Sequence, residues 1–147
     1  MTFLRMFTEE DAELLQQELW PNSSKSEVIS IIREWSACLY KGKYFEMLAI
    51  IVDDTVVGNV SLYEHSQNIV SLGVEIFSQY RRQGYAVAGV NLALEKAREH
   101  GYKLVQDQVL IDNAASVALH EKIGFETDGY VFRNAKDNKV NLFEFFL

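Results

Sequence analysis

A glycine-containing turn between a strand and a helix constrains this chain more than any other segment. The residues Gln79 to Ala86 (QYRRQGYA) follow an apolar run, Ile69 to Phe77, that is typical of a strand, and they precede a helical pattern that reaches His100. Such a turn leaves backbone N–H groups unpaired and directed at one point, and the positive end of the helix dipole adds to them. Gly84 lets the backbone approach a ligand closely, and the small Ala86 does not block that approach. The turn therefore suits a phosphate group, although it would also fit an ordinary loop with two solvated arginines.

The periodicity of the remaining chain predicts helices and strands in one domain that spans residues 1–147. Capping residues such as Thr8 and Ser24 predict two helices early in the chain, the second of which reaches about Tyr40. Short polar turns join the next three strands as antiparallel hairpins. A helix then separates the third of these strands from the next, so those two strands run parallel. We expect an α/β fold with helices at Ala86–His100 and Ala114–Ile123 and with strands at Thr2–Met6, Phe45–Val52, Val56–Glu64, Ile69–Phe77, Leu104–Ile111, Glu126–Arg133 and Lys139–Leu147.

The composition is that of a soluble globular protein, and it argues against several functions. Hydrophobic residues make up 48% and charged residues 24% of the chain. No run approaches the ~18 apolar residues of a membrane helix, and the first residues lack the apolar core of a signal peptide. The net charge of −7 argues against nucleic-acid binding and favours cationic partners. Cys38 is the only cysteine and the three histidines are scattered, so we expect no disulfide, no metal site and a cytoplasmic location.

Two well-known phosphate-binding motifs fit the turn poorly. A Walker A loop requires Gly-Lys-Ser/Thr, which does not occur in this chain. A dinucleotide fingerprint has the right spacing at Gly84, Ala86 and Gly89, with Asp107 about twenty residues further on. However, Ala86 replaces the glycine that lets a pyrophosphate approach, and the roughly forty residues after Asp107 are too few for a second mononucleotide-binding half. We therefore do not expect a dinucleotide-dependent oxidoreductase.

A second segment, Asn113 to Phe125 (NAASVALHEKIGF), combines a polar and an apolar stripe on one predicted helix. At 100° per residue, Asn113 and His120 fall within about 20° of each other, and Ser116 lies near the same face. This polar stripe follows the end of a strand close to the phosphate-type turn, so we expect it to take part in a site. It would otherwise be a solvent-facing stripe. A separate apolar stripe is expected to face the core and consists of Ala115, Leu119 and Ile123.

Both segments resemble the conserved blocks of one family. Residues Arg81–Ala86 (RRQGYA) resemble the Gln/Arg-x-x-Gly-x-Gly/Ala signature of the GCN5-related N-acetyltransferases, the GNAT family, and Asn113–Phe125 resembles the second block of that family. The resemblance covers nearly the whole chain, with its specific part between about Gly73 and Phe125. Within the family, the pattern is most similar to bacterial amine acetyltransferases of the ribosomal-protein and spermidine type. It implies a mixed, mostly antiparallel sheet of about seven strands, flanked by about four helices, with a splayed parallel pair.

The resemblance implies that acetyl-CoA is the co-substrate and that no metal takes part. Backbone N–H groups of the turn would hold the pyrophosphate, and the pantetheine arm would pair with the strand around Glu75 to Phe77. An N–H near Ile76 would polarise the thioester carbonyl, and Asn113 would bond the pantetheine amides. The implied cofactor-binding residues are Ile76, Phe77, Arg81, Arg82, Gln83, Gly84, Tyr85, Ala86, Asn113, Ser116 and His120.

Acetyl transfer to an amine calls for a general base, and departure of the thiolate is helped by an acid. Glu75, in the strand beside the expected thioester, is the favoured base. Asp107 in the parallel neighbour is its rival, and a water relay could replace both. His120 stands where the family often has tyrosine, so its role as the acid is open. It could instead orient the sulfur, relay protons from the amine, or lie on the helix surface.

The implied activity is acetyl transfer to a primary amine of a small molecule, a polyamine or a peptide. The alternative is a non-catalytic acyl-CoA-binding or sensing module. The resemblance places the acceptor site at residues 20–44 and 130–145, which are aromatic and acidic and therefore suit a cationic amine. The apolar C-terminal segment 142–147 predicts either a buried strand or pairing across a homodimer interface. The identity of the amine does not follow from the sequence.

Overall fold

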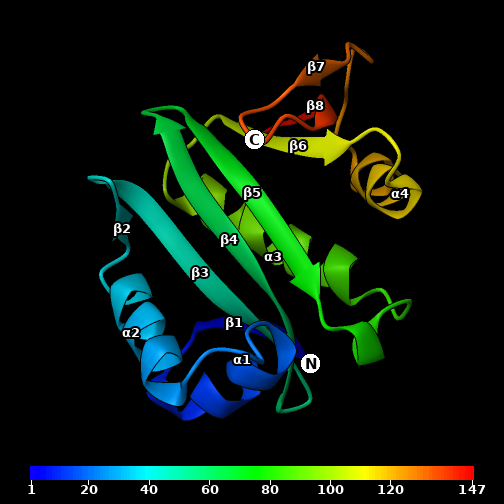
Figure 1. Ribbon diagram of the computed structural model, residues 1–147. Coiled ribbons are helices and arrows are strands. Elements are labelled where there is room, and N and C mark those ends of the chain that lie inside the picture. The colour runs from blue at the N-terminus through cyan, green and yellow to red at the C-terminus, as the bar shows by residue number, and fades with distance from the viewer.

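One mixed sheet organises the whole chain in the computed structural model, which describes residues 1–147. The strand order is β1-β3-β4-β5-β6-β8-β7, and β2 pairs with the side of β3 (Figure 1). The helices are α1 (Ala12–Glu18), α2 (Lys25–Trp35), α3 (Tyr85–Glu99) and α4 (Ala114–Ile123), with 3-10 turns η1 (Glu9–Asp11) and η2 (Ser78–Tyr80). The strands are β1 (Thr2–Met6), β2 (Leu39–Tyr40), β3 (Lys43–Val52), β4 (Thr55–Ser66), β5 (Ile69–Ile76), β6 (Leu104–Leu110), β7 (Phe132–Arg133) and β8 (Lys139–Phe146).

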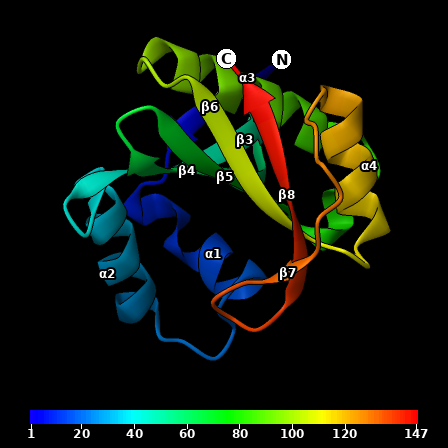
Figure 2. The same cartoon turned by 90° about the horizontal axis from the view of Figure 1, so that it is seen from above.

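Helices cover both faces of the sheet. Helices α1 and α2 lie on one face and α3 on the other, as the view from above shows (Figure 2). Side chains of β3 alternate between the two faces of the sheet. Leu48 and Ile50 belong to the core under α3, whereas Ala49 and Ile51 belong to the core under α1 and α2. A strand buried on both faces reads as a continuous apolar run rather than an alternating one. This explains why 47–52 contains no polar residue.

The first helical layer is attached to the sheet through a carboxylate with little exposure. Asp11, at the start of α1, accepts two hydrogen bonds from the Arg5 guanidinium of β1, at 2.8 and 2.9 Å, and a third from the Thr8 backbone N–H at 2.8 Å. The Asp11 side chain is 9% exposed. Burial alone would raise the pKa of Asp11, but these hydrogen bonds outweigh it and lower that pKa below its usual value.

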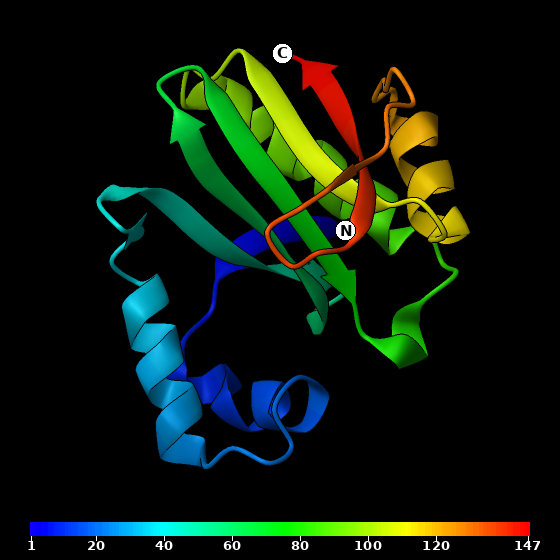
Figure 3. The same cartoon turned by 45° about the horizontal axis from the view of Figure 1, so that its top comes forward.

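The parallel pair β5–β6 separates along its length. The two strands are paired only from Ile69–Leu104 to Ser71–Gln106. Beyond this point β5 continues to Ile76 without a partner on β6, and the two strands diverge (Figures 1 and 3). On its other side, β6 is fully paired with β8. The sheet therefore has a splayed seam between β5 and β6, as expected from the family resemblance.

The predicted fold class and element order are confirmed, with differences at three places. The second helix ends at Trp35 rather than near Tyr40, because positive φ angles at Cys38 and Lys41 turn the chain into the short strand β2. This strand brings the sheet to eight strands. Of the strand expected at 126–133, only β7 and an isolated bridge between Glu126 and Glu144 form.

The C-terminal segment is a strand of the sheet. Strand β8 pairs with β6 along its length, and Phe143 is buried while Phe146 is 70% exposed. Of the two interpretations of this segment, the strand is thus the one that the fold confirms, and pairing between two copies stays a prediction. None of the helices is both long and apolar enough to cross a membrane.

Candidate functional site

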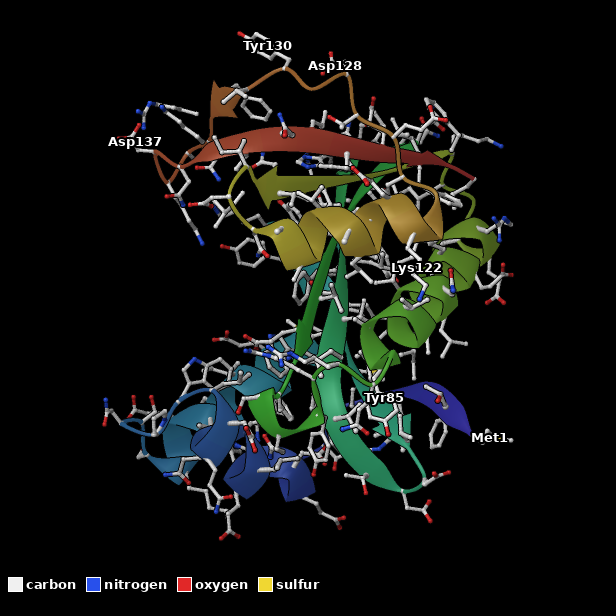
Figure 4. The ribbon with its side chains drawn as sticks, turned by 90° about the vertical axis from the view of Figure 1, so that its right-hand side faces the viewer. Met1, Tyr85, Lys122, Asp128, Tyr130 and Asp137 are labelled. Carbon is white, nitrogen blue, oxygen red and sulfur yellow. The ribbon has the colours of Figure 1, made fainter.

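A groove runs along the splayed seam, between the C-terminal end of β5, the start of α3 and the start of α4. Its volume is about 690 Å³. Figure 4 shows Tyr85 at the beginning of α3, with α4 across from it. The groove is lined by Val74, Glu75, Ile76, Tyr80, Arg81, Arg82, Gly84, Tyr85, Ala86, Val87, Asn113, Ala115, Ser116 and Leu119.

At one end of this groove, the N-terminus of α3 is open. Gly84 precedes the helix with φ +80°, and no side chain caps the helix there. Arg82 also has a positive φ, +64°, so the turn curls its backbone N–H groups toward one side. The first N–H groups of this 15-residue helix have no helical partner and carry the positive end of its dipole. A Cβ at Gly84 would meet nothing within 4 Å, so the space beside these donors is free for a phosphate.

Along the next stretch, β5 directs backbone groups into the groove. The Phe77 N–H donates to the Val57 carbonyl at 2.9 Å, and the register pairs Gly58 with Ile76 and Val60 with Val74. Bonded and non-bonded pairs alternate along antiparallel strands, so the N–H and C=O groups of Val74 and Ile76 point away from β4. They face the gap where β6 has separated from β5. An extended ligand with amide groups can therefore pair with this edge as an additional strand does.

The side chain of Arg81 contacts the C-terminal end of this strand edge. Its Nε–H donates to the Ile76 carbonyl at 3.0 Å. That bond satisfies the last outward carbonyl of β5, while the Ile76 N–H remains directed into the groove. A single N–H donor at this place can stabilise negative charge on a ligand oxygen.

Across the groove, Asn113 forms the N-cap of α4. Its side-chain oxygen accepts a hydrogen bond from the Ser116 N–H at 3.1 Å. This bond orients the Asn113 side chain and leaves its NH₂ group as a donor at the groove wall. The Ser116 residue lines the groove as well.

Behind that wall lie two titratable groups in contact, of which His120 is buried and Asp107 is partly exposed. His120 of α4 is 1% exposed and packs against the rings of Phe125 and Phe143 at 5.0 and 5.4 Å. Its Nε2 lies 2.7 Å from Oδ2 of Asp107 on β6, and its Nδ1 lies 2.7 Å from the Ser116 carbonyl oxygen. A carbonyl oxygen only accepts, so Nδ1 carries a hydrogen. A second proton must then lie between Nε2 and Asp107, because two lone pairs would otherwise face each other.

The protonation of this pair follows from burial and mutual contact. Burial raises the pKa of the Asp107 carboxyl, and the hydrogen bond with His120 only partly offsets that effect. For His120, burial disfavours the imidazolium, but the bonds to Asp107 and to the Ser116 carbonyl outweigh it and raise the pKa. The two directions agree on one point, since both mean that the pair keeps its shared proton to higher pH than the two groups would separately. The proton belongs to the pair rather than to either residue.

A second, more polar groove opens next to the pair. Its volume is about 470 Å³, and Asp107, whose side chain is 19% exposed, forms part of its wall. Strands β5, β6 and β8 contribute most of this wall. The lining residues are His65, Ser71, Gln106, Asp107, Gln108, Phe132 and Leu142. Asp107 is thus the one carboxylate of this groove, and it connects the groove to the buried His120.

The structure gathers most of the predicted cofactor-binding residues in the first groove. Phe77, Gln83 and His120 do not line it. Phe77 is buried in the core under α1 and α2, and its N–H is already bonded to Val57. The Gln83 side chain accepts a hydrogen bond from the Tyr85 hydroxyl at 3.1 Å. The predicted residues that do line the groove are Glu75, Ile76, Arg81, Arg82, Gly84, Tyr85, Ala86, Asn113 and Ser116.

The faces of α4 differ from the prediction. Asn113 lines the groove whereas His120 is buried, because Asn113 is the cap with non-helical angles (φ −87°, ψ 80°) and the 100° rule does not extend to it. Ala115 and Leu119, which we expected in the core, line the groove instead. Val74, Tyr80 and Val87 also line the groove, and their place there was not predicted from the sequence. Val74 lies two residues before Ile76 on β5 and therefore faces the same side, and this alternation could have identified Val74.

A mixed sheet with a splayed parallel pair, an open helix N-terminus and an unpaired strand edge form a groove that suits a phosphate group and an extended arm with amide groups. The sequence comparison identifies the family. The model of the acetyltransferase (GNAT) domain matches residues 2–126, and the chain belongs to this family.

Curated relatives are more distant. The uncharacterized N-acetyltransferase YokL of Bacillus subtilis (strain 168), derived from the SPbeta prophage, is 28% identical over 67% of this chain. The human N-acetyltransferase 8 is 29% identical over 70% of this chain. The chain spans about half the length of these two relatives, 57% and 44% respectively.

Solved structures share the fold at low identity. RimL, a ribosomal L7/L12 alpha-N-protein acetyltransferase in complex with coenzyme A, has a TM-score of 0.85 at 17% identity, with 99% of this chain and 94% of that chain covered. The microcin C7 self-immunity acetyltransferase MccE, in complex with acetyl-CoA and AMP, has a TM-score of 0.84 at 19% identity, with 99% and 92% covered. A chimera of the spermidine N-acetyltransferase SpeG has a TM-score of 0.77 at 18% identity, with 98% and 95% covered.

Proposed function

We propose that this protein is an N-acetyltransferase that moves the acetyl group of acetyl-CoA to a primary amine. One observation carries the proposal: the open N-terminus of α3 and the unpaired edge of β5 lie in one groove. The first suits a pyrophosphate and the second an extended arm with amide groups. Membership of the acetyltransferase family and the CoA-bound relatives of the same fold support this interpretation.

Each part of the groove has a role in this proposal. The N–H groups around Gly84 to Ala86 hold the pyrophosphate, and the Ile76 N–H pairs with a pantetheine amide, assisted by Asn113. Acetyl-CoA supplies a thioester whose acetyl carbon an amine can attack. Val74 lies two residues further from the pyrophosphate along β5, and its outward N–H can donate to the carbonyl oxygen of that thioester as negative charge develops on it.

The second groove suits the amine. Its wall is polar and includes one carboxylate, Asp107, whose Oδ1, the oxygen that His120 does not contact, can accept the proton that an ammonium group loses. This favours Asp107 over Glu75 as the base, because Glu75 is solvent-exposed and has no titratable partner. His120 then acts through Asp107. It holds the carboxylate in place through the hydrogen bond between Nε2 and Oδ2, whose proton the two residues share. The acceptors named for the relatives, a protein N-terminus and spermidine, are both amines, so small-molecule, polyamine and peptide amines are the candidates.

Binding and turnover test the proposal together. At 100 times its dissociation constant, acetyl-CoA should stabilise the fold by roughly 2.7 kcal/mol, which is about 5–10 °C in melting temperature for a domain of this size. Thiol release should follow on at least one amine from a panel of polyamines, amino acids, aminoglycosides and peptide N-termini. A melting temperature that NAD raises and acetyl-CoA does not would contradict the proposal. Acetyl-CoA binding without turnover on any amine would instead indicate the non-catalytic acyl-CoA-binding module.

A matched pair of glycine variants locates the site. Gly84 and Gly101 lie next to opposite ends of α3, both have positive φ (+80° and +87°), and an added Cβ would meet nothing at either. Glutamate at either position therefore brings a similar backbone strain. Gly84→Glu should abolish the thermal shift with acetyl-CoA, because it places bulk and negative charge where the pyrophosphate binds. Gly101→Glu should retain the shift.

A further inference from the structure

We propose that Asn59 on β4 and Glu75 on β5 form a subsite for the acceptor, and that this subsite binds the second positive charge of a diamine or polyamine. The inference deepens the proposed acetyl transfer and rests on it. The reacting amine binds in the second groove, at Asp107. Asn59 and Glu75 hold the part of the acceptor that does not react.

The first observation is a buried side-chain amide without a partner. Asp11, Glu46 and His120 are buried as well, and each is hydrogen-bonded to another side chain. Asn59 is 8% exposed, yet its side-chain amide forms no hydrogen bond with another group of the protein. No fully enclosed polar atom lacks a partner, so this amide still reaches solvent and is accessible to a ligand. An unpaired polar group in such a place is unfavourable for the fold and calls for an explanation.

The second observation is the face of the sheet on which Asn59 lies. Asn59 stands between Ala49 of β3 and Glu75 of β5 in the register of the strands. Opposite residues of an antiparallel pair share a face, with Cβ atoms about 5 Å apart. Ala49 belongs to the core under α1 and α2, so Asn59 and Glu75 point to that face too. Ala49 is fully covered there, whereas Glu75 is exposed and forms no ion pair. The opening at Asn59 therefore lies on the Glu75 side.

An amide oxygen beside an unpaired carboxylate suits a positively charged nitrogen. Both groups accept hydrogen bonds, and an ammonium group only donates them. Glu75 attracts the ammonium group by its charge, and the Asn59 oxygen orients it. Hydrogen bonds that involve charged groups are stronger than those between neutral groups. A second ammonium group of the acceptor is therefore the ligand that fits Asn59 and Glu75 together.

Small residues separate this subsite from the second groove. Ser71 and Gly73 precede Glu75 on the same face of β5, because side chains alternate along a strand. Ser71 also lines the second groove. Only a glycine intervenes between Ser71 and Glu75 on this face, and the residue opposite that glycine on β4 is the small Ser61. An elongated acceptor can therefore lie along β5 from the second groove to Glu75.

The spacing of the two carboxylates sets the length of the acceptor. Gln106 pairs with Ser71, so Asp107 is level with Leu72 on β5. Glu75 follows Leu72 after a distance of roughly 10 Å along the strand. The separation of β5 and β6 adds a lateral component to this distance. An acceptor that reaches both carboxylates is therefore extended, with two nitrogens about that far apart.

Paired series of amines test the subsite. The ratio of kcat/KM for an α,ω-diamine or polyamine to kcat/KM for the monoamine of the same length measures the preference for a second charge. In the wild type this preference should rise with length until the two nitrogens are roughly 10 Å apart. Glu75→Gln keeps the size of the side chain but removes its charge, and it should lower the preference by about 10-fold. The loss should appear in KM more than in kcat, because the reacting amine binds elsewhere, at Asp107.

Asn59→Leu separates a role in binding from a role in folding. Leucine is of similar size and has no polar group, so the urea midpoint should equal that of the wild type or exceed it. The preference for the doubly charged amine should nevertheless fall. A lower midpoint with an unchanged preference would show that Asn59 serves the fold and not the subsite. The matched control for charge is Glu99→Gln, at the opposite end of α3 from the first groove, which should keep the wild-type preference.

Three results would overturn the proposal. The wild type could handle diamines and monoamines of equal length alike, Glu75→Gln could keep the wild-type preference, or Glu99→Gln could lose as much of it as Glu75→Gln does. None of these readouts requires Asn59→Leu to fold. Turnover on peptide N-termini or amino acids but on no diamine would also overturn the subsite, while the proposed acetyl transfer would stand. Failure of the wild type to bind acetyl-CoA or to acetylate any amine would instead reject the proposed function.

Discussion

At the scale of single residues, the Asp107–His120 pair is the feature with the clearest consequences. Asp107→Asn keeps the shape and a hydrogen bond to His120 but removes the carboxylate. If Asp107 is the base, turnover should fall by about 10²–10⁴-fold, while the affinity for acetyl-CoA stays nearly unchanged. Glu75→Gln should have a small effect on both. A large loss of turnover in Glu75→Gln and none in Asp107→Asn would return the role of the base to Glu75.

The same variant has a pH signature in stability. The folded pKa of His120 is raised above its ordinary value of 6.5, so its contribution to the free energy of unfolding is complete below pH 6.5. That contribution is lost as pH rises through the raised pKa. Urea unfolding of the wild type should therefore show a decrease in the free energy of unfolding from about pH 6.5 upward that Asp107→Asn lacks. The exposed Asp112 supplies the control: Asp112→Asn should follow the wild type, and an unchanged slope in Asp107→Asn would show that the pair shares no proton.

At the scale of elements, the close packing of α3 against the sheet depends on Gly89. A Cβ at this buried position would lie 2.5 Å from the Ile50 Cδ1 on β3. Alanine would favour the helix by up to about 1 kcal/mol, but overpacking of this kind costs about 1–3 kcal/mol, so Gly89→Ala should be destabilising. Ile50→Val removes the obstructing methyl group and alone costs about 1 kcal/mol. In chemical denaturation the double variant should therefore lose less stability than the sum of the single variants, and strict additivity would show that the contact does not matter.

At the scale of the whole molecule, the seam divides the sheet into two parts that the ligand connects. Strands β6 to β8 and α4 join the rest of the sheet through the short β5–β6 ladder. A ligand in the groove contacts both parts. Hydrogen exchange should therefore slow on acetyl-CoA binding around residues 74–76, 85–87 and 113–119, by up to roughly 2.7 kcal/mol of opening free energy at 100 times the dissociation constant. Amides of β1 and α2 that exchange by local opening should respond less, and protection confined to these two elements would contradict the location of the site.

Much of the site could be predicted because it depends on local chemistry. Gly84 and the small Ala86 indicated an open helix start, and this depends on φ and side-chain size alone. The cap at Asn113 and the strand parity of Val74 and Ile76 are also short-range properties. His120 could not be placed in the same way. Its orientation depends on where α4 begins and on which residues of β6 and β8 lie beneath it, and both are set by contacts between distant segments.

The sequence by itself determined the elements, their order and the turn that can hold a phosphate, because hydrophobic periodicity, capping and glycine angles act over a few residues. Only the tertiary structure decided which groups meet. The proton shared by Asp107 and His120 and the groove at the splayed seam both arise between segments far apart in the chain. Register and packing set those distances to fractions of an ångström, and no short stretch of sequence encodes them.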